Sequence, residues 1–437
     1  MKNPLQHRLK RHYTDPRIGI YSVCSANRYV LEAAMLQARQ DNSILLIEST
    51  SNQVDQFGGY SGMTPADFVL FVRNIAERMQ LPWSRVLLGG DHLGPNVWQD
   101  EAAEPAMQKA IEQIRAYVAA GYSKIHLDTS MCLRHDPVTP SGNIAAELAA
   151  ERAADLCVAA EKTFTAGTKL SAAPVYVIGT DVPVPGGAQH NIAHIEITSV
   201  KLVRQTIELT RSAFFDHGLQ EAWNRVVAVV VQPGVEFSDT TVQDYDHQAA
   251  VKLSKFISTT ESFVYEAHST DFQLPSALIE MVSDHFAILK VGPWLTFAFR
   301  EAVFGLAHME DEYLQNKKTA TLSCIKSILD QAMLNKPKYW QKHYSGDKNK
   351  QALARAYSYS DRVRYYWPEQ PVQESLRRLI NNLKKDPPPL NLVSQYFPDQ
   401  YWKIRERLLE NDPVQLIYDC IQQVLKYYSR AAGMSEK

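Results

Sequence analysis

Acidic and imidazole side chains recur along this chain at the ends of short apolar segments. Asp91 and His92 are adjacent and follow two glycines, and His268 comes two residues after Glu266. A carboxylate beside an imidazole can transfer protons, and histidines are common ligands of divalent metal ions. An Asp-His pair is a weak signal alone, but its place at the end of an apolar segment predicts a site for acid–base or metal chemistry.

A second group of polar residues indicates a place for an anion. Lys290 to Gly292 offers a cation and an accessible backbone, Ser269 offers a hydroxyl, and Asn96 ends the glycine-rich segment after His92. These residues predict a phosphate-binding corner. Each has a simpler explanation too: a histidine can hydrogen-bond a loop, Lys290 can pair with an acid, and glycine pairs often mark tight turns.

The elements that must position these residues are repeated strand–helix units. Apolar, β-branched runs alternate with longer amphipathic segments, which is typical of a parallel sheet. The runs are Ile18–Cys24, Ile44–Glu48, Val86–Asp91, Lys124–Asp128, Pro174–Gly179, Val226–Gln232, Phe263–His268 and Ala287–Val291. Eight units favour a closed (β/α)8 TIM barrel over an open sheet, and a TIM barrel builds its active site at the carboxyl ends of its strands. No G-x-G-x-x-G follows the first run, which weakens the dinucleotide-binding alternative.

The segments between the runs have helical signals. Apolar residues from Met107 to Val118 recur at helical spacing and Gly121 can end that helix. Thr64 and the proline after it predict a helix over Pro65–Met79. The alternation stops after about Glu310, so we expect a barrel over residues 1–310 and a mostly helical extension over residues 311–437.

One segment of the extension, Tyr357–Trp367, combines aromatic residues with arginines. Rings and guanidinium groups stack well, so this segment could contact a partner protein. Docking onto the barrel itself is the favoured interpretation.

Composition limits the classes of partner. Lys and Arg number 46 against 48 Asp and Glu, which leaves no basic field to attract nucleic acid. No stretch approaches the ~18 apolar residues that a membrane span needs. Five scattered cysteines, none in a C-x-x-C pair, argue against disulfides or a thiolate zinc cluster. We therefore expect a cytoplasmic protein with small-molecule or protein partners, without nucleic acid or membrane contacts.

Motifs along nearly the whole chain resemble one known family. They are Ile20–Ser25, Glu48–Gly59, Gly89–Pro95, Val184–Gly187, Val231–Glu236, Glu266–Asp271 and Tyr357–Trp367. The sequence resembles the Z subunit of D-tagatose-1,6-bisphosphate aldolase, the GatZ/KbaZ family, once labelled tagatose 6-phosphate kinase. The chain has no P-loop and no protein-kinase signature, so we do not expect phosphoryl transfer.

The resemblance implies a barrel related to class II aldolases and an accessory role. A catalytic Y subunit cleaves tagatose 1,6-bisphosphate to glyceraldehyde 3-phosphate and dihydroxyacetone phosphate. The Z subunit supports the activity and stability of Y in galactitol, N-acetylgalactosamine and tagatose catabolism. Two alternatives stay open: a self-sufficient metal-dependent 4-epimerase or aldolase that uses retro-aldol chemistry on a ketose phosphate, and a scaffold with a vestigial pocket.

The resemblance also assigns site residues. Class II aldolases use an Asp-His pair after the third strand and zinc-binding histidines after the sixth and seventh strands. Asp91 resembles the proton-transfer residue of that pair, and His92 and His268 resemble the metal ligands. The sixth run ends without a histidine, and two imidazoles alone do not make a firm zinc site.

Oxygen ligands could complete the metal site and would favour Mn²⁺ or Mg²⁺ over Zn²⁺. Glu236 is the tentative choice, with Gln232, Glu48 and Asp181 as alternatives. Glu48 and Asp128 are the further catalytic candidates, since both end predicted strands.

Overall fold

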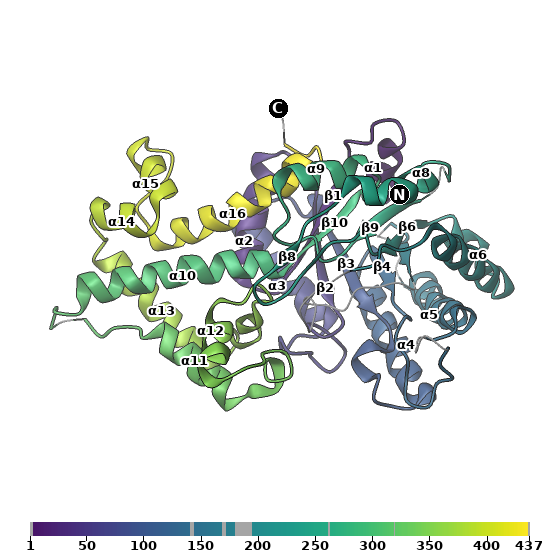
Figure 1. Ribbon diagram of the computed structural model, residues 1–437, viewed down its shortest axis with the longest axis horizontal. Helices are drawn as coiled ribbons and strands as arrows, with labels where there is room; N and C mark the ends of the chain where they lie inside the picture. Colours follow the sequence, from purple (N-terminus) through teal and green to yellow (C-terminus); the bar gives the residue numbers. More distant parts are fainter. Residues whose placement is uncertain are drawn as a thin grey trace.

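Eight parallel strands close into a barrel in the order β1-β10-β9-β6-β5-β4-β3-β2 (Figure 1). The computed structural model describes residues 3–139, 144–167, 172–179, 195–260, 263–318 and 320–435. The strands are β1 (Ile20–Cys24), β2 (Leu45–Thr50), β3 (Val86–Leu93), β4 (Lys124–Leu127), β5 (Val175–Ile178), β6 (Val226–Val231), β9 (Val264–Ala267) and β10 (Ile288–Val291). Each corresponds to one of the eight predicted runs, so the TIM-barrel prediction is confirmed.

Helices surround the barrel and account for its apolar strands. They are α2 (Arg28–Gln40), α3 (Pro65–Arg78), α4 (Ala103–Ala120), α5 (Ala146–Ala166), α6 (Val200–Asp216), α7 (Gln220–Trp223), α8 (His247–Ile257), α9 (Pro275–Ser283) and α10 (Pro293–Leu314). All six residues of β6 are buried, because one face of the strand meets the interior and the other meets helices.

Local signals fix several helix ends as predicted. Thr64 caps α3 and exchanges hydrogen bonds with Asp67 in a capping box. Gly121 ends α4 with φ +95°, a conformation that glycine adopts without steric cost. A short hairpin follows the sixth barrel strand, β7 (Glu236–Phe237) with β8 (Val242–Gln243), and the sequence did not predict it.

The C-terminal part is helical, and its last helix returns to the barrel. It contains α11 (Ile325–Asn335), α12 (Lys348–Tyr357), α13 (Gln370–Lys385), α14 (Leu390–Tyr396), α15 (Pro398–Arg405) and α16 (Pro413–Ala431). Helix α16 packs against α2, α9 and α10, and Figure 1 shows it running from the extension to the barrel wall. The amino-terminal helix α1 (Pro4–His12) meets the same end of the chain, since Arg8 donates to the carbonyl of Ala432 at 2.9 Å. Helix α10 passes through residue 310 without a break, and a separate extension over residues 311–437 stays a prediction.

The aromatic and arginine-rich segment Tyr357–Trp367 docks onto the barrel, which was the favoured interpretation of its sequence. The amide of Tyr359 donates to the carbonyl of Asp239 at 3.0 Å, and the Ser358 hydroxyl donates to the Asp239 carboxylate at 3.0 Å. The ring of Trp367 packs edge-on against Phe299 at 4.7 Å. This docking brings the short 3₁₀ helix η4 (Arg362–Tyr366) to the mouth of the barrel.

Two sequence predictions cannot be placed. Asp181 and the motif Val184–Gly187 lie outside the described residues. Among the helices that the structure describes, none has the length and apolar character needed to cross a membrane.

Candidate active site

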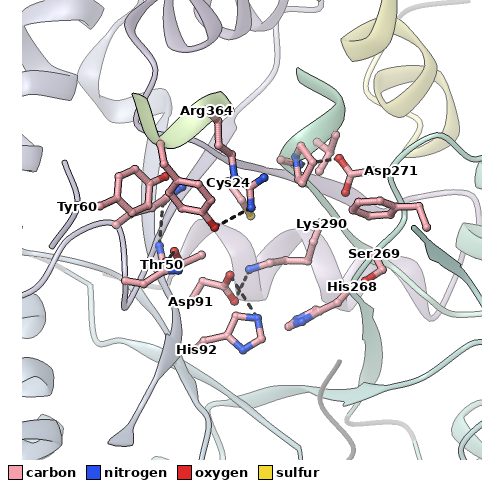
Figure 2. A pocket seen from close by; sticks show the side chains of 17 residues that line it. Cys24, Thr50, Tyr60, Asp91, His92, His268, Ser269, Asp271, Lys290 and Arg364 are labelled. Carbon is pink, nitrogen blue, oxygen red and sulfur yellow. Dashed lines mark hydrogen bonds and ion pairs between the residues drawn. The ribbon is translucent and has the colours of Figure 1, made fainter. Parts of the chain in front are cut away.

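A pocket of about 600 Å³, counting the open space at its mouth, lies at the carboxyl ends of the barrel strands. Residues from distant parts of the chain line it together (Figure 2), among them Asp91, His92, His268, Ser269, Lys290 and Arg364. The sequence predicted that the first five would meet in one cavity, and the structure brings them together there.

The end of β3 positions the Asp-His pair under local strain. His92 has φ +48°, which few residues other than glycine adopt, and such strain is often found at functional sites. Gly89 makes room for a neighbouring side chain, because a Cβ atom there would lie 2.7 Å from Cγ of Glu48. Gly94 is equally constrained, since its Cβ would lie 1.8 Å from the carbonyl oxygen of Asp128.

Two buried lysines bind carboxylates across the barrel interior. Lys290 Nζ lies 2.6 Å from both the Asp91 and the Glu48 carboxylates. Lys124 Nζ lies 2.8 Å from Glu48 Oε1 and 2.8 Å from Glu266 Oε2. Burial lowers the pKa of Lys290, but Asp91 and the other acids outweigh burial and hold the pKa well above its usual value. The simpler explanation of Lys290, pairing with an acid, therefore holds in the structure.

The same lysines keep the acids ionised. Burial raises the pKa of Asp91, but His92 and Lys290 outweigh it and hold the pKa of Asp91 well below its usual value. Glu266 shows the same balance, because Lys124 and Lys290 outweigh its burial. Glu48 is fully buried beneath the two lysines and does not line the pocket, so it can act on a ligand only through its neighbours.

Three histidine rings surround Asp91. The ring centroids of His92 and His268 are 4.8 Å apart, and the ring of His126 on β4 lies 5.2 Å from His92 and 5.3 Å from His268. Burial lowers the pKa of His268 to about 3, so its imidazole is neutral near pH 7. His92 differs: burial lowers its pKa, but Asp91 and Asp128 raise it by more. Asp128 does not line the pocket and contacts His92 Nδ1 at 2.7 Å from behind.

Four of these residues could hold a divalent metal ion. Asp91, His126, Glu266 and His268 each offer one ligand atom, and these atoms lie within 4.8 Å of one another. Nε2 of His126 is buried and has no hydrogen-bond partner among the described residues, so it is available as a ligand. Two imidazoles and two carboxylates suit Zn²⁺ or Mn²⁺. The residues present therefore fit the expected metal.

The cluster differs from the predicted ligand set. His268 belongs to it, whereas His92 lies beside it with one nitrogen bound to Asp128. Glu236, the tentative third ligand, is not part of the cluster. It lies on the β7-β8 hairpin beyond the barrel strand, where its carboxylate accepts a hydrogen bond from the amide of Phe237. Burial raises the pKa of Glu236 to about 7. Gln232 is also engaged locally, since its carbonyl accepts from the amide of Gly234 at 2.8 Å.

The predicted phosphate corner is already occupied by an acid. Ser269, Lys290 and Gly292 line the pocket, but Asp271 Oδ1 accepts from the amide of Gly292 at 3.0 Å and from that of Trp294 at 2.8 Å. Asn96 lies on the 3₁₀ helix η2 (Pro95–Trp98) and does not line the pocket. The backbone donors that a phosphate would use at the start of α10 are thus taken.

Comparison with known proteins identifies the family. Residues 5–433 match the family described as D-tagatose-1,6-bisphosphate aldolase subunit GatZ/KbaZ-like. The chain belongs to the GatZ/KbaZ-like family. A crystal structure from Sinorhizobium meliloti 1021, described as a probable tagatose 6 phosphate kinase, is 41% identical with a TM-score of 0.86, and the match covers 94% of this chain and 100% of that one.

Two aldolase structures are more distant. The YdjI aldolase from Escherichia coli K12 is 10% identical with a TM-score of 0.43, and 88% of this chain and 99% of that one are covered. The fructose-bisphosphate aldolase from Campylobacter jejuni is 13% identical with a TM-score of 0.40, and 86% and 91% are covered. Similarities of this size carry no argument about function. Membership of the GatZ/KbaZ-like family is what relates this chain to tagatose-bisphosphate aldolase.

Sequence reasoning missed four site residues of this GatZ/KbaZ-like chain. His126 and Lys124 lie inside a strand, Glu266 was noted only as a strand end, and Arg364 lies far away in the extension. The segment from Lys124 to Asp128 did contain a signal, because polar and apolar residues alternate there and alternate residues share one face of a strand. No periodic signal of that kind surrounds Arg364.

Proposed function

We propose that this chain is itself a metal-dependent enzyme that acts on a ketose phosphate by retro-aldol chemistry. The observation that supports it is the convergence of Asp91, His92 and His268 in one pocket, with the buried ring of His126 directly beside them. Nε2 of His126 has no hydrogen-bond partner among the described residues. In such a reaction the bond between C3 and C4 breaks, and the C4 hydroxyl proton moves to a base. Rejoining the two halves on the other face of the aldehyde would invert C4, as a 4-epimerase does.

The metal ligands in this proposal are His126, His268, Asp91 and Glu266. A divalent ion bound there would polarise the substrate carbonyl and stabilise the negative charge that develops on its oxygen. Lys124 and Lys290 hold the two carboxylates in place. The neutral state of His268 suits ligation, because a protonated imidazole has no lone pair to offer.

His92 is the best candidate for proton transfer. It lines the pocket, its Nδ1 contacts Asp128 at 2.7 Å, and its Nε2 lies 3.8 Å from Asp91. A carboxylate behind a histidine fixes the orientation of the ring and stabilises its protonated form. His92 can therefore take the proton from a substrate hydroxyl and return it, with Asp128 as its positioning residue.

The test is an assay of the purified chain alone. D-tagatose 6-phosphate is incubated with Zn²⁺, Mn²⁺ or Mg²⁺, and both the C4 epimer and the cleavage products are measured. We expect turnover with at least one ion and its loss in His126→Ala and His268→Ala, each checked for folding by circular dichroism. Inactivity of the wild type with every ion and both readouts would count against the proposal.

A second function is favoured by the family, which is described as an aldolase subunit. In this function the chain supports the activity and stability of a catalytic Y subunit in the cytoplasm, within galactitol, N-acetylgalactosamine or tagatose catabolism. Co-expression with the cognate Y subunit should then raise aldolase activity or lengthen its lifetime. The His126→Ala variant separates the two functions, because an accessory role needs a folded chain and not an intact metal site.

A further inference from the structure

The C-terminal extension contributes a cation to the pocket. Arg364 and Tyr365 of η4 line it together with Tyr60, and Figure 2 shows Arg364 on a different side of the pocket from Asp91 and His92. The guanidinium is held in place, because it donates to the carbonyl of Asp361 at 3.2 Å and to the hydroxyl of Tyr365 at 2.9 Å. Its position is therefore set before any ligand binds.

Arg364 forms no salt bridge with any described residue. No carboxylate of the described residues lies within 4.0 Å of its guanidinium nitrogens, which donate to the carbonyls of Ser360 and Asp361 and to the hydroxyl of Tyr365. The carboxylates of Asp361 and Asp271 act on Arg364 only over longer distances, and Asp361 pairs with Arg300. The guanidinium carbon lies 4.5 Å from the centroid of the Tyr365 ring, and that ring packs edge-on against Tyr60 at 4.7 Å. An arginine presents a rigid fork of donors that matches the oxygens of a phosphate.

The other cationic part of the pocket is closed to an anion. Lys290 lies 2.6 Å from two carboxylates, and Asp271 accepts the amide hydrogens of Gly292 and Trp294. An incoming phosphate would have to displace Asp271 there, and would meet its negative charge first. Among the described residues no carboxylate lies as close to Arg364, whose present acceptors are uncharged oxygens.

We propose that Arg364 binds the terminal phosphate of the ligand, so that the C-terminal extension selects phosphorylated ketoses. This inference names the residue that recognises the phosphate of the substrate proposed above, and it rests on that proposal for the sugar part of the ligand. The carbonyl end of the ligand would lie at the histidine cluster and the phosphate on its last carbon at Arg364. The barrel then supplies the reacting groups and the extension supplies the recognition of phosphate.

The test compares D-tagatose 6-phosphate with D-tagatose. Dissociation constants are measured by calorimetry in EDTA, which suppresses metal-dependent turnover, for the wild type, Arg364→Gln, Arg364→Lys and Arg28→Gln. Arg28 lines the adjacent chamber and pairs with Glu32, so it is a matched arginine outside this pocket. Inorganic phosphate serves as a third probe.

We expect the wild type to prefer the phosphate ester, and Arg364→Gln to lose roughly 10- to 100-fold of that preference, the usual effect of hydrogen bonds to a charged group. Affinity for D-tagatose should not change. Arg28→Gln should keep the full preference. Arg364→Lys keeps the charge without the fork and should show a partial loss. If Arg364→Gln does not fold, the preference of Arg364→Lys for the phosphate ester tests the inference instead. A full preference in both Arg364 variants, or an equal loss in Arg28→Gln, overturns the inference.

The two proposals fail in different ways. If the wild type binds the ester through Arg364 but converts no ketose phosphate with any ion, the proposed enzyme function fails and the phosphate site stands. If the wild type turns over its substrate while Arg364→Gln keeps the same KM ratio for ester and free sugar, the phosphate site fails and the enzyme function stands.

Discussion

Replacing Lys124 by methionine tests whether the buried charge network holds the barrel interior together. The Lys124 side chain is fully buried, with Nζ 2.8 Å from both Glu48 and Glu266. Methionine has a similar length but no charge, so the two carboxylates would be left with Lys290 as their counter-charge. Removing one partner of a buried ion pair costs about 3–5 kcal/mol. We expect Lys124→Met to lower the free energy of unfolding by that amount near pH 8.

The loss should depend on pH in a defined direction. In the wild type, burial raises the pKa of Glu266, but Lys124 and Lys290 outweigh it and lower the pKa well below its usual value. A carboxyl with a lowered folded pKa stabilises the protein above its unfolded pKa of about 4.3, and this stability is lost as the pH falls. In the variant, burial without Lys124 should raise that pKa instead. The buried acid then takes up a proton more easily as the pH falls, so the difference between wild type and variant should be larger at pH 8 than at pH 5.

Urea unfolding followed by circular dichroism at both pH values measures this difference. Lys109→Met is the matched control, because Lys109 pairs with Glu101 at 2.6 Å while both side chains are about a third exposed (34% and 36%). An exposed pair of this kind contributes about 1 kcal/mol or less. A loss below 1 kcal/mol in Lys124→Met, or an equal loss at pH 5 and pH 8, would refute the reasoning.

Three further predictions concern the site. Gly89→Ala should lower the free energy of unfolding by about 1–3 kcal/mol, because its Cβ would lie 2.7 Å from Cγ of Glu48. Gly167→Ala is the control: its Cβ would have no neighbour closer than 3.5 Å, so the melting temperature should change little. Asp128→Asn should reduce kcat for the ketose phosphate roughly 100-fold with an unchanged circular dichroism spectrum, since His92 loses its orienting carboxylate. Dialysis against a chelator should lower the melting temperature, and one divalent ion at about 100 times its Kd should restore about 2.7 kcal/mol; an unchanged melting curve would argue against a bound metal.

The barrel could be predicted from the sequence because its strands are apolar runs with clear ends. The run over Val226–Gln232 became the strand Val226–Val231, and the predicted helix over Pro65–Met79 became Pro65–Arg78. The β7-β8 hairpin gave no such signal, since each of its strands has two residues. The return of α16 to the barrel wall depends on tertiary packing between distant helices, which local periodicity does not contain.

The site was predicted in part, for a reason that strand geometry explains. Residues at strand ends, such as Asp91 and His268, were found because an apolar run stops there. His126 lies within its strand, so a search of strand ends passed over it, although its alternation with Ile125 indicated a face turned to the interior. Glu236 was chosen for its closeness in sequence to the sixth strand, and the hairpin places it outside the metal cluster.

The charges inside the barrel bear on whether it is only a scaffold. Three buried carboxylates of the described interior, Glu48, Asp91 and Glu266, face the two buried ammonium groups of Lys124 and Lys290, and a fourth, Asp128, contacts His92. Moving an ionised group from water into a protein interior costs several kcal/mol. Replacing buried ion pairs by apolar residues of similar volume often leaves the stability of a protein unchanged or raises it by about 1–4 kcal/mol. An interior with excess negative charge therefore has a cost that a scaffold has no need to bear, and a divalent cation at the histidine cluster would balance it. The same arrangement that costs stability is what a metal-dependent enzyme requires.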